Sequence, residues 1–218
     1  MKILTWNLER LQKNRKEAIL RIVENQHADI LILTETSSEI NPGKEYHTIA
    51  TENLESGYDG ITYKAGENRT TIWTKYPIKT QRVTYDKFTS VCVDVETEFG
   101  LLTIYGTIIG VFGGKGERFK NDFEKQSKDF VKLEGNICIA GDMNTTLSGY
   151  VYPSHDARNK LKEIIQRMDL CCPTASLDKN VDHILLSNSF VGNRKIGVTL
   201  WNEDLTLSDH IGICLSIE

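Results

Sequence analysis

A short apolar run ends abruptly in Gly-Asp-Met-Asn at residues 137–144, and this stretch most constrains how the chain can fold. The preceding Ile-Cys-Ile-Ala is typical of a buried strand, so Asp142 and Asn144 lie at its carboxyl end. They are two residues apart, so on an extended backbone their side chains point the same way. A carboxylate there can hold water and an amide can donate to an oxygen. An Asx-type turn favours the same residue types, so this stretch alone leaves both interpretations open.

The amino-terminal segment supplies two more polar residues at strand ends. A strand is predicted over residues 2–7, and it stops at Asn7. Residues 12–26 have the apolar periodicity of an amphipathic helix, and residues 29–33 form a second buried strand that ends at Glu35. We therefore expect Asn7 and Glu35 at neighbouring strand ends, where open α/β sheets bind their ligands.

The remaining chain alternates between strand and helix patterns. Strands without intervening helices are predicted over residues 46–50, 60–64, 70–75, 91–97 and 101–109, which suggests antiparallel pairing. Helices are predicted over residues 118–133 and 155–168, and later strands over 180–187, 192–201 and 211–217. The glycine-rich stretch at residues 110–117 lacks the Gly-Lys-Ser/Thr ending of a nucleotide-binding loop, and it fits a mobile loop or a plain linker equally well.

Polar residues accompany five of the predicted strands, and carboxylates dominate among them. They are Asn7, Glu35, Asp142 with Asn144, Asp182, and Asp209 with His210. Carboxylate and amide oxygens without thiolates suit a hard cation, so we expect Mg²⁺ or Mn²⁺. The cation would bind Glu35, with Asn7 and Asp209 in support, and would neutralise a phosphate oxygen.

The other members of this set suit phosphoryl chemistry. Asp142 could hold the attacking water, and Asn144 could donate to the nucleophile or to a phosphoryl oxygen. His210 could donate to a non-bridging oxygen as charge develops there. An imidazolium needs a partner, and Asp182 is the residue predicted to orient it.

At this point the chain resembles the endonuclease/exonuclease/phosphatase superfamily, which includes deoxyribonuclease-I-like and abasic-site endonucleases. The matching blocks are Thr5-Trp6-Asn7, Leu33-Thr34-Glu35, Gly141-Asp142-Met143-Asn144, Val181-Asp182-His183-Ile184 and Ser208-Asp209-His210. The resemblance implies a four-layer α/β sandwich, in which two mixed sheets pack face to face with helices outside. It also implies metal-dependent phosphoester hydrolysis. In that reaction Asn7, Glu35 and Asp209 would be metal-associated, Asp142, Asn144 and His210 would act in the chemistry, and Asp182 would pair with the histidine.

Two departures from the family pattern affect the expected substrate. Several members carry a second histidine on the mid-chain strand, whereas residues 102–109 contain none. Tyr105 could replace it as a hydroxyl that contacts phosphate, or it could be a core tyrosine of the strand. The chain is also short for the family, so long recognition insertions are missing. Arg118 and Arg158, in or beside loops, are the residues expected to contact substrate.

Length and composition favour one soluble domain over residues 1–218. The 218 residues can bury a sizeable core, and the net charge of -4 argues against a wholly basic nucleic-acid coat. The odd count of five cysteines, with no Cys-x-x-Cys, indicates a reducing compartment, and no signal peptide or membrane span is apparent. We therefore expect a cytoplasmic monomer.

Three functions compete at this stage. The first is an Mg²⁺-dependent nuclease or phosphodiesterase that acts on nucleic acid. The second is a phosphatase of small phosphorylated molecules, such as inositol phosphates or nucleotides, which the acidic composition favours somewhat. The third is a catalytically silent binding module on the same fold, against which the complete polar set argues.

Overall fold

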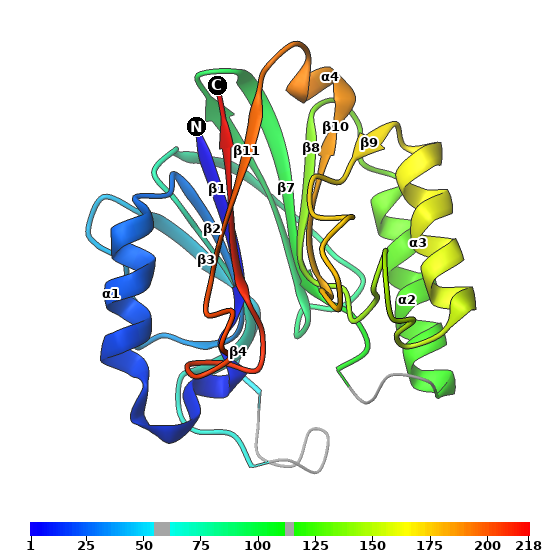
Figure 1. Cartoon of the computed structure of the whole chain (residues 1–218). Coiled ribbons are helices and arrows are strands. Elements are labelled where there is room, and N and C mark those ends of the chain that lie inside the picture. Colours follow the sequence, from blue (N-terminus) through cyan, green and yellow to red (C-terminus); the bar gives the residue numbers. More distant parts are fainter. Residues whose placement is uncertain (55–61, 112–115) are drawn as a thin grey trace.

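Two six-stranded sheets pack face to face in the computed structural model, which describes residues 1–54, 62–111 and 116–218. Figure 1 shows helix α1 (Lys16–Gln26) outside one sheet and helices α2 (Glu117–Phe130) and α3 (His155–Arg167) outside the other. The order is therefore helix, sheet, sheet, helix, which confirms the predicted four-layer sandwich of mixed sheets.

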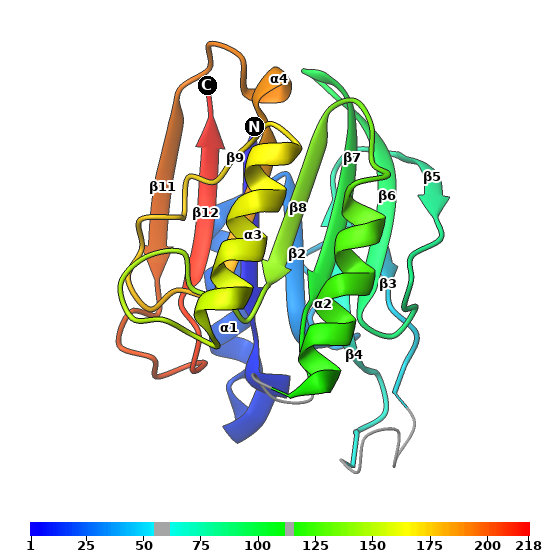
Figure 2. The ribbon, with the colours of Figure 1, turned by 90° about the vertical axis from the view of Figure 1, so that its right-hand side faces the viewer.

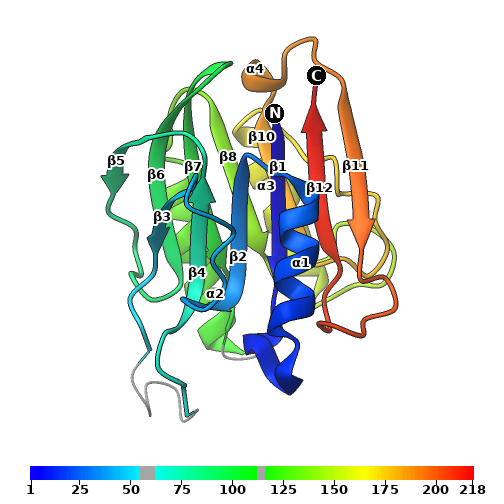
Figure 3. The same cartoon turned by 90° about the vertical axis from the view of Figure 1, so that its left-hand side faces the viewer.

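The first sheet joins the two ends of the chain. Its strand order is β11 (Ile196–Trp201), β12 (Gly212–Ile217), β1 (Lys2–Asn7), β2 (Ile30–Ser37), β4 (Glu67–Thr74) and β3 (His47–Ala50). The β1–β2 pair is parallel, with Asn7 opposite Thr34, and the other pairs are antiparallel. Figure 3 shows α1 crossing the outer face of this sheet. The amino and carboxyl ends are neighbours, because the Met1 ammonium donates to Ile217 O over 3.0 Å.

The second sheet comes from the middle of the chain. Its order is β5 (Ile78–Arg82), β6 (Ser90–Thr97), β7 (Gly100–Ile108), β8 (Ile137–Asp142), β10 (Asp182–Ser187) and β9 (Leu170–Cys171). Only β7 and β8 pair in parallel in the described chain, around the crossover through α2. Figure 2 shows α2 and α3 lying side by side over this sheet.

Strand alternation builds three apolar layers. Along β8, Cys138 and Ala140 face the other sheet, while Ile137 and Ile139 face the helices. The inner layer holds residues of both sheets, and the outer layers pack under α1 on one side and under α2 and α3 on the other. Fully burying an aliphatic side chain contributes about 1.5–3 kcal/mol, so each of the three layers contributes substantially to stability.

Most predicted elements are present, and the main differences are the following. The helix predicted from residue 12 begins at Lys16, because a 3₁₀ helix, Glu9–Asn14, precedes it. Strand 192–201 begins only at Ile196, after a single helical turn, α4 (Asn188–Val191). Residues 62–64 are not strand, and residues 60–61 of that prediction lie outside the described chain, as do residues 112–115 of the glycine-rich stretch. Strand β5 was not predicted, because it is largely exposed and lacks an apolar alternation.

Candidate active site

The predicted polar residues converge at one edge of the sandwich, shown at the bottom of Figure 1. Asn7 closes β1, Asp142 closes β8, and Asp182 opens β10 directly opposite Asp142. His210 lies just before β12, which pairs with β1. The two sheets thus contribute to one cluster, as their strand ends meet across the interface.

Gly141 sets the direction of the β8 end. Its φ of +133° is strained for other residues, and an added Cβ would lie 1.9 Å from Thr107 O on β7. The Asp142 side chain then lies on the inner face of β8 and contacts the opposite sheet. Its Oδ2 accepts from Asn7 Nδ2 over 3.1 Å, a hydrogen bond that joins the two sheets.

Asn144 holds the Asp142 carboxylate from its own turn. The Asn144 backbone N–H donates to Oδ1 over 2.9 Å, and its amide donates to Oδ2 over 3.1 Å. The same amide donates to Ile109 O over 2.9 Å, so both of its N–H groups are used. The Asx turn and the polar cluster, which the sequence left as alternatives, are therefore both present. Asn144 positions Asp142, which corrects the prediction that it donates to substrate.

His210 forms a short ion pair with Asp182. Its Nδ1 lies 2.6 Å from Asp182 Oδ2, and the two side chains are 16% and 1% exposed. Burial alone would lower the pKa of His210, but the charges of Asp182, Asp142 and Asp209 outweigh it and raise that pKa to about 10. The imidazole is therefore protonated at neutral pH.

Asp142 has the opposite electrostatic character. Burial raises the pKa of its carboxyl well above the usual value, His210 opposes that rise, and the negative charge of Asp182 adds to it. A carboxylate in this state is a stronger base than an exposed one. The cluster thus contains a buried base beside a charged acid.

Three residues to which the sequence analysis gave no role hold the loop of His210. Asn202 donates through one amide to Ser208 O over 2.8 Å and to His210 O over 2.7 Å, while its oxygen accepts from Leu207 N over 2.9 Å. Trp6 Nε1 also donates to His210 O over 3.0 Å. Ser208 Oγ donates to the Asn7 carbonyl over 2.7 Å and accepts from His210 N. No sequence signal distinguishes Asn202 from an ordinary turn asparagine.

Glu35 lies on the other side of the cluster, next to a buried arginine. Its φ of 45° departs from the extended conformation, so strand alternation does not govern its side chain. Arg69 Nη1 lies 3.6 Å from Glu35 Oε1, and the Arg69 side chain is 4% exposed. Burial raises the pKa of Glu35, while Arg69 and His210 oppose that rise.

Arg69 belongs to a basic group that the sequence analysis also missed. The guanidinium groups of Arg10 and Arg69 lie 4.7 Å and 5.1 Å from the centroid of the Tyr63 ring. Arg10 Nη2 also pairs with Glu67 over 2.8 Å. The sequence offered one signal for this basic group, namely the charged residues within the otherwise neutral segment that forms β4.

The donor set at this edge fits a divalent cation. Glu35 and Asp209 offer carboxylate oxygens, and Asn7 Oδ1 accepts only one hydrogen bond, from Glu9 N, in the described chain. Within the described residues, the buried Asp182 Oδ1 has no hydrogen-bond partner. These hard oxygens and the surplus negative charge suit Mg²⁺ or Mn²⁺ better than a softer metal.

A second grouping also has metal-ligand spacing. Ligand atoms of Asp142, Asp182 and His210 lie within 4.8 Å of one another. The imidazole Nδ1 is engaged with Asp182 over 2.6 Å, so this nitrogen is not available to a cation.

Tyr105 is not part of the site, which corrects one prediction. Its ring is 1% exposed in the layer under α2 and α3, edge-to-face with Phe130 at 5.0 Å between centroids. Its hydroxyl donates to Ser90 Oγ over 3.0 Å. Alternation places Tyr105 on the helix-facing side of its sheet, whereas Asp142 is on the opposite side.

Arg158 holds the loop that follows Asn144, and its contact with substrate stays a prediction. From α3 its guanidinium donates to Thr146 O over 2.7 Å, to Ser148 O over 3.0 Å and to Tyr150 O over 2.7 Å. The side chain therefore fixes the loop that follows Asn144. Arg118 is exposed in the first turn of α2, and its contact with substrate stays a prediction.

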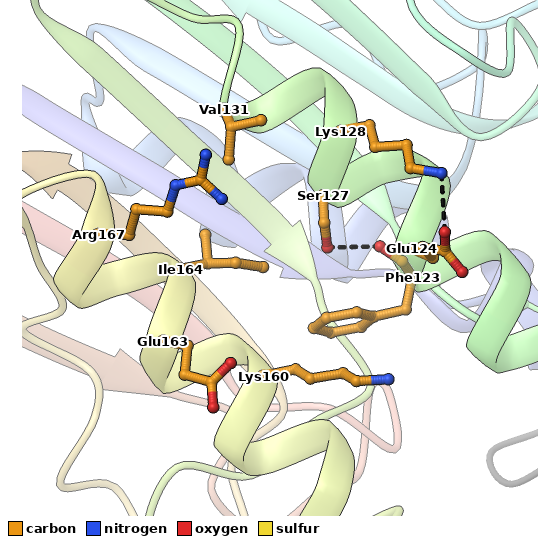
Figure 4. A pocket seen from close by; sticks show the side chains of 9 residues that line it. All are labelled: Phe123, Glu124, Ser127, Lys128, Val131, Lys160, Glu163, Ile164 and Arg167. Carbon is orange, nitrogen blue, oxygen red and sulfur yellow. Dashed lines mark hydrogen bonds and ion pairs between the residues drawn. The ribbon is translucent and has the colours of Figure 1, made fainter.

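Two concavities bear on where substrate binds. A pocket of 500 Å³ opens beside Asn144, Asp182 and His210. Another of 260 Å³ lies between α2 and α3, where Phe123 and Ile164 form an apolar base (Figure 4). None of the predicted site residues lines the second pocket. Of these two pockets, the one of 500 Å³ adjoins the polar cluster.

Comparisons with known proteins agree with this geometry. An AP endonuclease from Archaeoglobus fulgidus superposes with a TM-score of 0.74 at 15% identity, covering 100% of this chain and 99% of that chain. A 3′-5′ exonuclease from Neisseria meningitidis gives 0.72 at 16% identity, with 100% of both chains covered. A 3′ phosphatase from Neisseria bound to a product DNA hairpin gives 0.70 at 15% identity, covering 100% and 99%.

At these identities the superpositions show the fold, and no match is found among curated proteins. The model of the Endonuclease/Exonuclease/phosphatase family matches residues 4–210, which include every block of the polar cluster. The chain belongs to the Endonuclease/Exonuclease/phosphatase family.

Proposed function

We propose that this protein is a metal-dependent phosphodiester hydrolase that acts on nucleic acid. Members of its family are hydrolases that act on phosphoesters with a divalent metal. The observation that carries the proposal is geometric: the buried Asp142 carboxylate lies within 4.8 Å of the His210 imidazole, which is itself paired with Asp182 across the two sheets. A silent binding module would not need such a pair.

Asp142 is the general base for the attacking water. Donors from Asn7 and Asn144 fix both of its oxygens, so the carboxylate is held in one orientation. Because burial raises its pKa, the carboxylate accepts a proton more readily than an exposed aspartate would. A positioned base of this kind typically contributes about 10²–10⁴-fold to the rate.

His210 stabilises the charge that develops on phosphorus-bound oxygen. Asp182 binds its Nδ1 and so directs Nε2 toward the pocket side of the cluster. Nε2 lies 3.7 Å from Asp209 Oδ1, which is too long for a hydrogen bond, so its N–H can donate to a phosphoryl oxygen. Such a preorganised donor acts mainly in the transition state.

Glu35 and Asp209, with Asn7, are the residues proposed to hold the metal. When bound, the cation would neutralise a phosphate oxygen and stabilise the leaving oxygen. Arg69 places a permanent positive charge beside Glu35 and so favours the ionised carboxylate that a cation requires.

The nucleic-acid substrate is supported by the superposed structures, among them an AP endonuclease and a phosphatase bound to a DNA hairpin. Arg118, exposed at the start of α2, is the proposed contact to the phosphate backbone. All five cysteines are free, which suits action in the reducing cytoplasm, and we propose that the protein acts there as a monomer. No helix of the described residues is long and apolar enough to cross a membrane.

A substrate panel tests the proposal. Single-stranded DNA, duplex DNA, RNA and small phosphomonoesters are incubated with Mg²⁺, Mn²⁺ or EDTA. We expect cleavage of a nucleic acid with metal, none with EDTA, and loss of activity in Asp142→Asn. The matched control is Asp156→Asn, an exposed carboxylate on α3. Turnover of phosphomonoesters alone would refute the proposed substrate, and full activity in EDTA would refute the mechanism.

A further inference from the structure

The pocket of 500 Å³ beside the acid–base pair is lined by both aromatic and acidic side chains. It is lined by the loop after Asn144, the segment before Asp182 and the loop before His210. Its size is typical of a site for one small ligand. Because Asp182 and His210 form one of its walls, a group bound in it lies next to the proposed acid–base pair.

Two large apolar side chains stand exposed at this pocket. Tyr150 is 66% exposed and Leu205 is 48% exposed, although large apolar groups are mostly buried in this fold. Tyr152, half-buried, adds a second aromatic ring to the lining. Exposed rings at the mouth of a site offer flat faces on which a planar group can stack.

The charges of the lining disfavour a heavily phosphorylated occupant. Asp178, Asp182, Glu203 and Asp209 are acidic, while Lys179 and the His210 imidazolium, already paired with Asp182, are the cations among the described lining residues. A ring that carries several phosphates would meet carboxylates rather than the cations it needs. An uncharged ring with amino groups would instead find acceptors, as carboxylates accept from the exocyclic N–H groups of bases.

We propose that this pocket binds a single nucleoside, the one that carries the scissile phosphate, with its base stacked against Tyr150, Tyr152 and Leu205. The inference rests on the proposed function and specifies its substrate class. A base inside a duplex must leave its stack to enter such a pocket. The enzyme therefore acts on nucleotides that are terminal, unpaired or single-stranded in preference to paired interior ones.

Two model esters separate recognition of the nucleoside from the phosphate chemistry. Deoxyadenosine 5′-(p-nitrophenyl phosphate) and methyl p-nitrophenyl phosphate share their charge and their leaving group, and they differ in the nucleoside. The readout is the ratio of kcat/KM for the nucleoside ester to that for the methyl ester. We expect the native protein to favour the nucleoside ester.

Tyr150→Ala and Leu205→Ala should each lower this ratio. The loss of one base–aromatic stack corresponds to about 5- to 160-fold, and Leu205 should lie toward the lower end. The Tyr150 variant should fold, since Arg158 and Thr146 bind the Tyr150 carbonyl and not its ring. Leu101→Ala is the matched control, because Leu101 is also 48% exposed and does not line the pocket.

The outcomes are distinct. If both esters are hydrolysed at similar kcat/KM, or if neither variant changes the ratio, the nucleoside pocket is refuted while the proposed hydrolase function stands. If neither ester is hydrolysed with Mg²⁺ or Mn²⁺, the proposed function fails and this inference fails with it. A ratio that falls in both pocket variants and not in Leu101→Ala supports the inference.

Discussion

Replacing Asp182 by asparagine removes one charge from the buried pair with His210 and preserves its shape. The Nδ1–Oδ2 distance is 2.6 Å, and Asp182 is 1% exposed. The asparagine oxygen still accepts the imidazole N–H, so the hydrogen bond survives while the ion pair is lost. The substitution therefore isolates the electrostatic contribution of Asp182 to the protonation of His210.

The expected size of the effect follows from the geometry. Two charges roughly 4 Å apart at an effective dielectric constant of about 20 interact by about 4 kcal/mol, which corresponds to about 3 pKa units. This agrees with the rise of the pKa of His210 from 6.5 to about 10, which Asp142 and Asp209 also support. Since those carboxylates remain, we expect the pKa of His210 to fall by about 2–3 units in the variant.

An NMR titration of the metal-free protein measures this fall. In the native protein the His210 ring should stay protonated through neutral pH, while in Asp182→Asn it should titrate near neutrality. Asp178→Asn is the control, since this carboxylate lines the same pocket and is exposed to solvent. A fall of less than about 0.5 unit in Asp182→Asn would refute the pairing and the role built on it.

The same pair makes the stability of the metal-free protein depend on pH. The folded pKa of His210 is raised above its unfolded value, so its stabilisation is fully present below about pH 6.5 and is lost as pH rises through about 10. The difference in unfolding free energy between the native protein and Asp182→Asn should therefore be largest near pH 6 and shrink toward pH 10. Urea unfolding in EDTA measures it, and a difference that grows with pH would contradict this sign.

Four further predictions concern the surrounding residues. Glu35→Gln should weaken Mg²⁺ binding in calorimetry with an unchanged circular dichroism spectrum, and unchanged affinity would remove Glu35 from the metal site. Asn202→Ala, which removes a donor from two carbonyls and an acceptor from one N–H, should cost about 1–3 kcal/mol of stability and lower kcat, as urea unfolding and steady-state assays can show. Asp142→Asn and His210→Ala should each lose about 10²–10⁴-fold in kcat, without adding in the double variant, in single-turnover assays with binding followed in Ca²⁺. Arg158→Lys should raise proteolysis of the loop after Asn144, because an ammonium cannot reach the carbonyls that the guanidinium joins, and an unchanged cleavage rate would argue against that role.

The strand-end residues could be predicted because strand position alone determines where they lie. Asn7, Asp142 and Asp182 each adjoin an apolar run, and the ends of those runs meet at one sheet edge. Tyr105 could not be placed in this way. Its distance from the site depends on which face of the strand meets the helices, and a uniformly buried strand carries no alternation that tells its two faces apart.

The residues that hold the site residues in place could not be predicted from the sequence, for a different reason. Arg158 is basic and near a loop, which suits substrate contact as well as the loop contacts that it makes. Asn202 and Arg69 act on residues more than five positions away in the chain or on another strand, so no local pattern links them to His210 or Glu35. Such contacts follow from the tertiary fold.

The division of the site between two sheets has a consequence for how the chain acquires activity. The sheet of Asp142 and Asp182 is complete once residues 78–187 have been made, but His210 still has no fixed place. Its position depends on β12 entering between β11 and β1, a strand that is synthesised before the sheet of Asp142. A nascent chain therefore contains Asp142 long before it contains His210, and under the proposed function it can hydrolyse its substrate only once β12 has paired with β1.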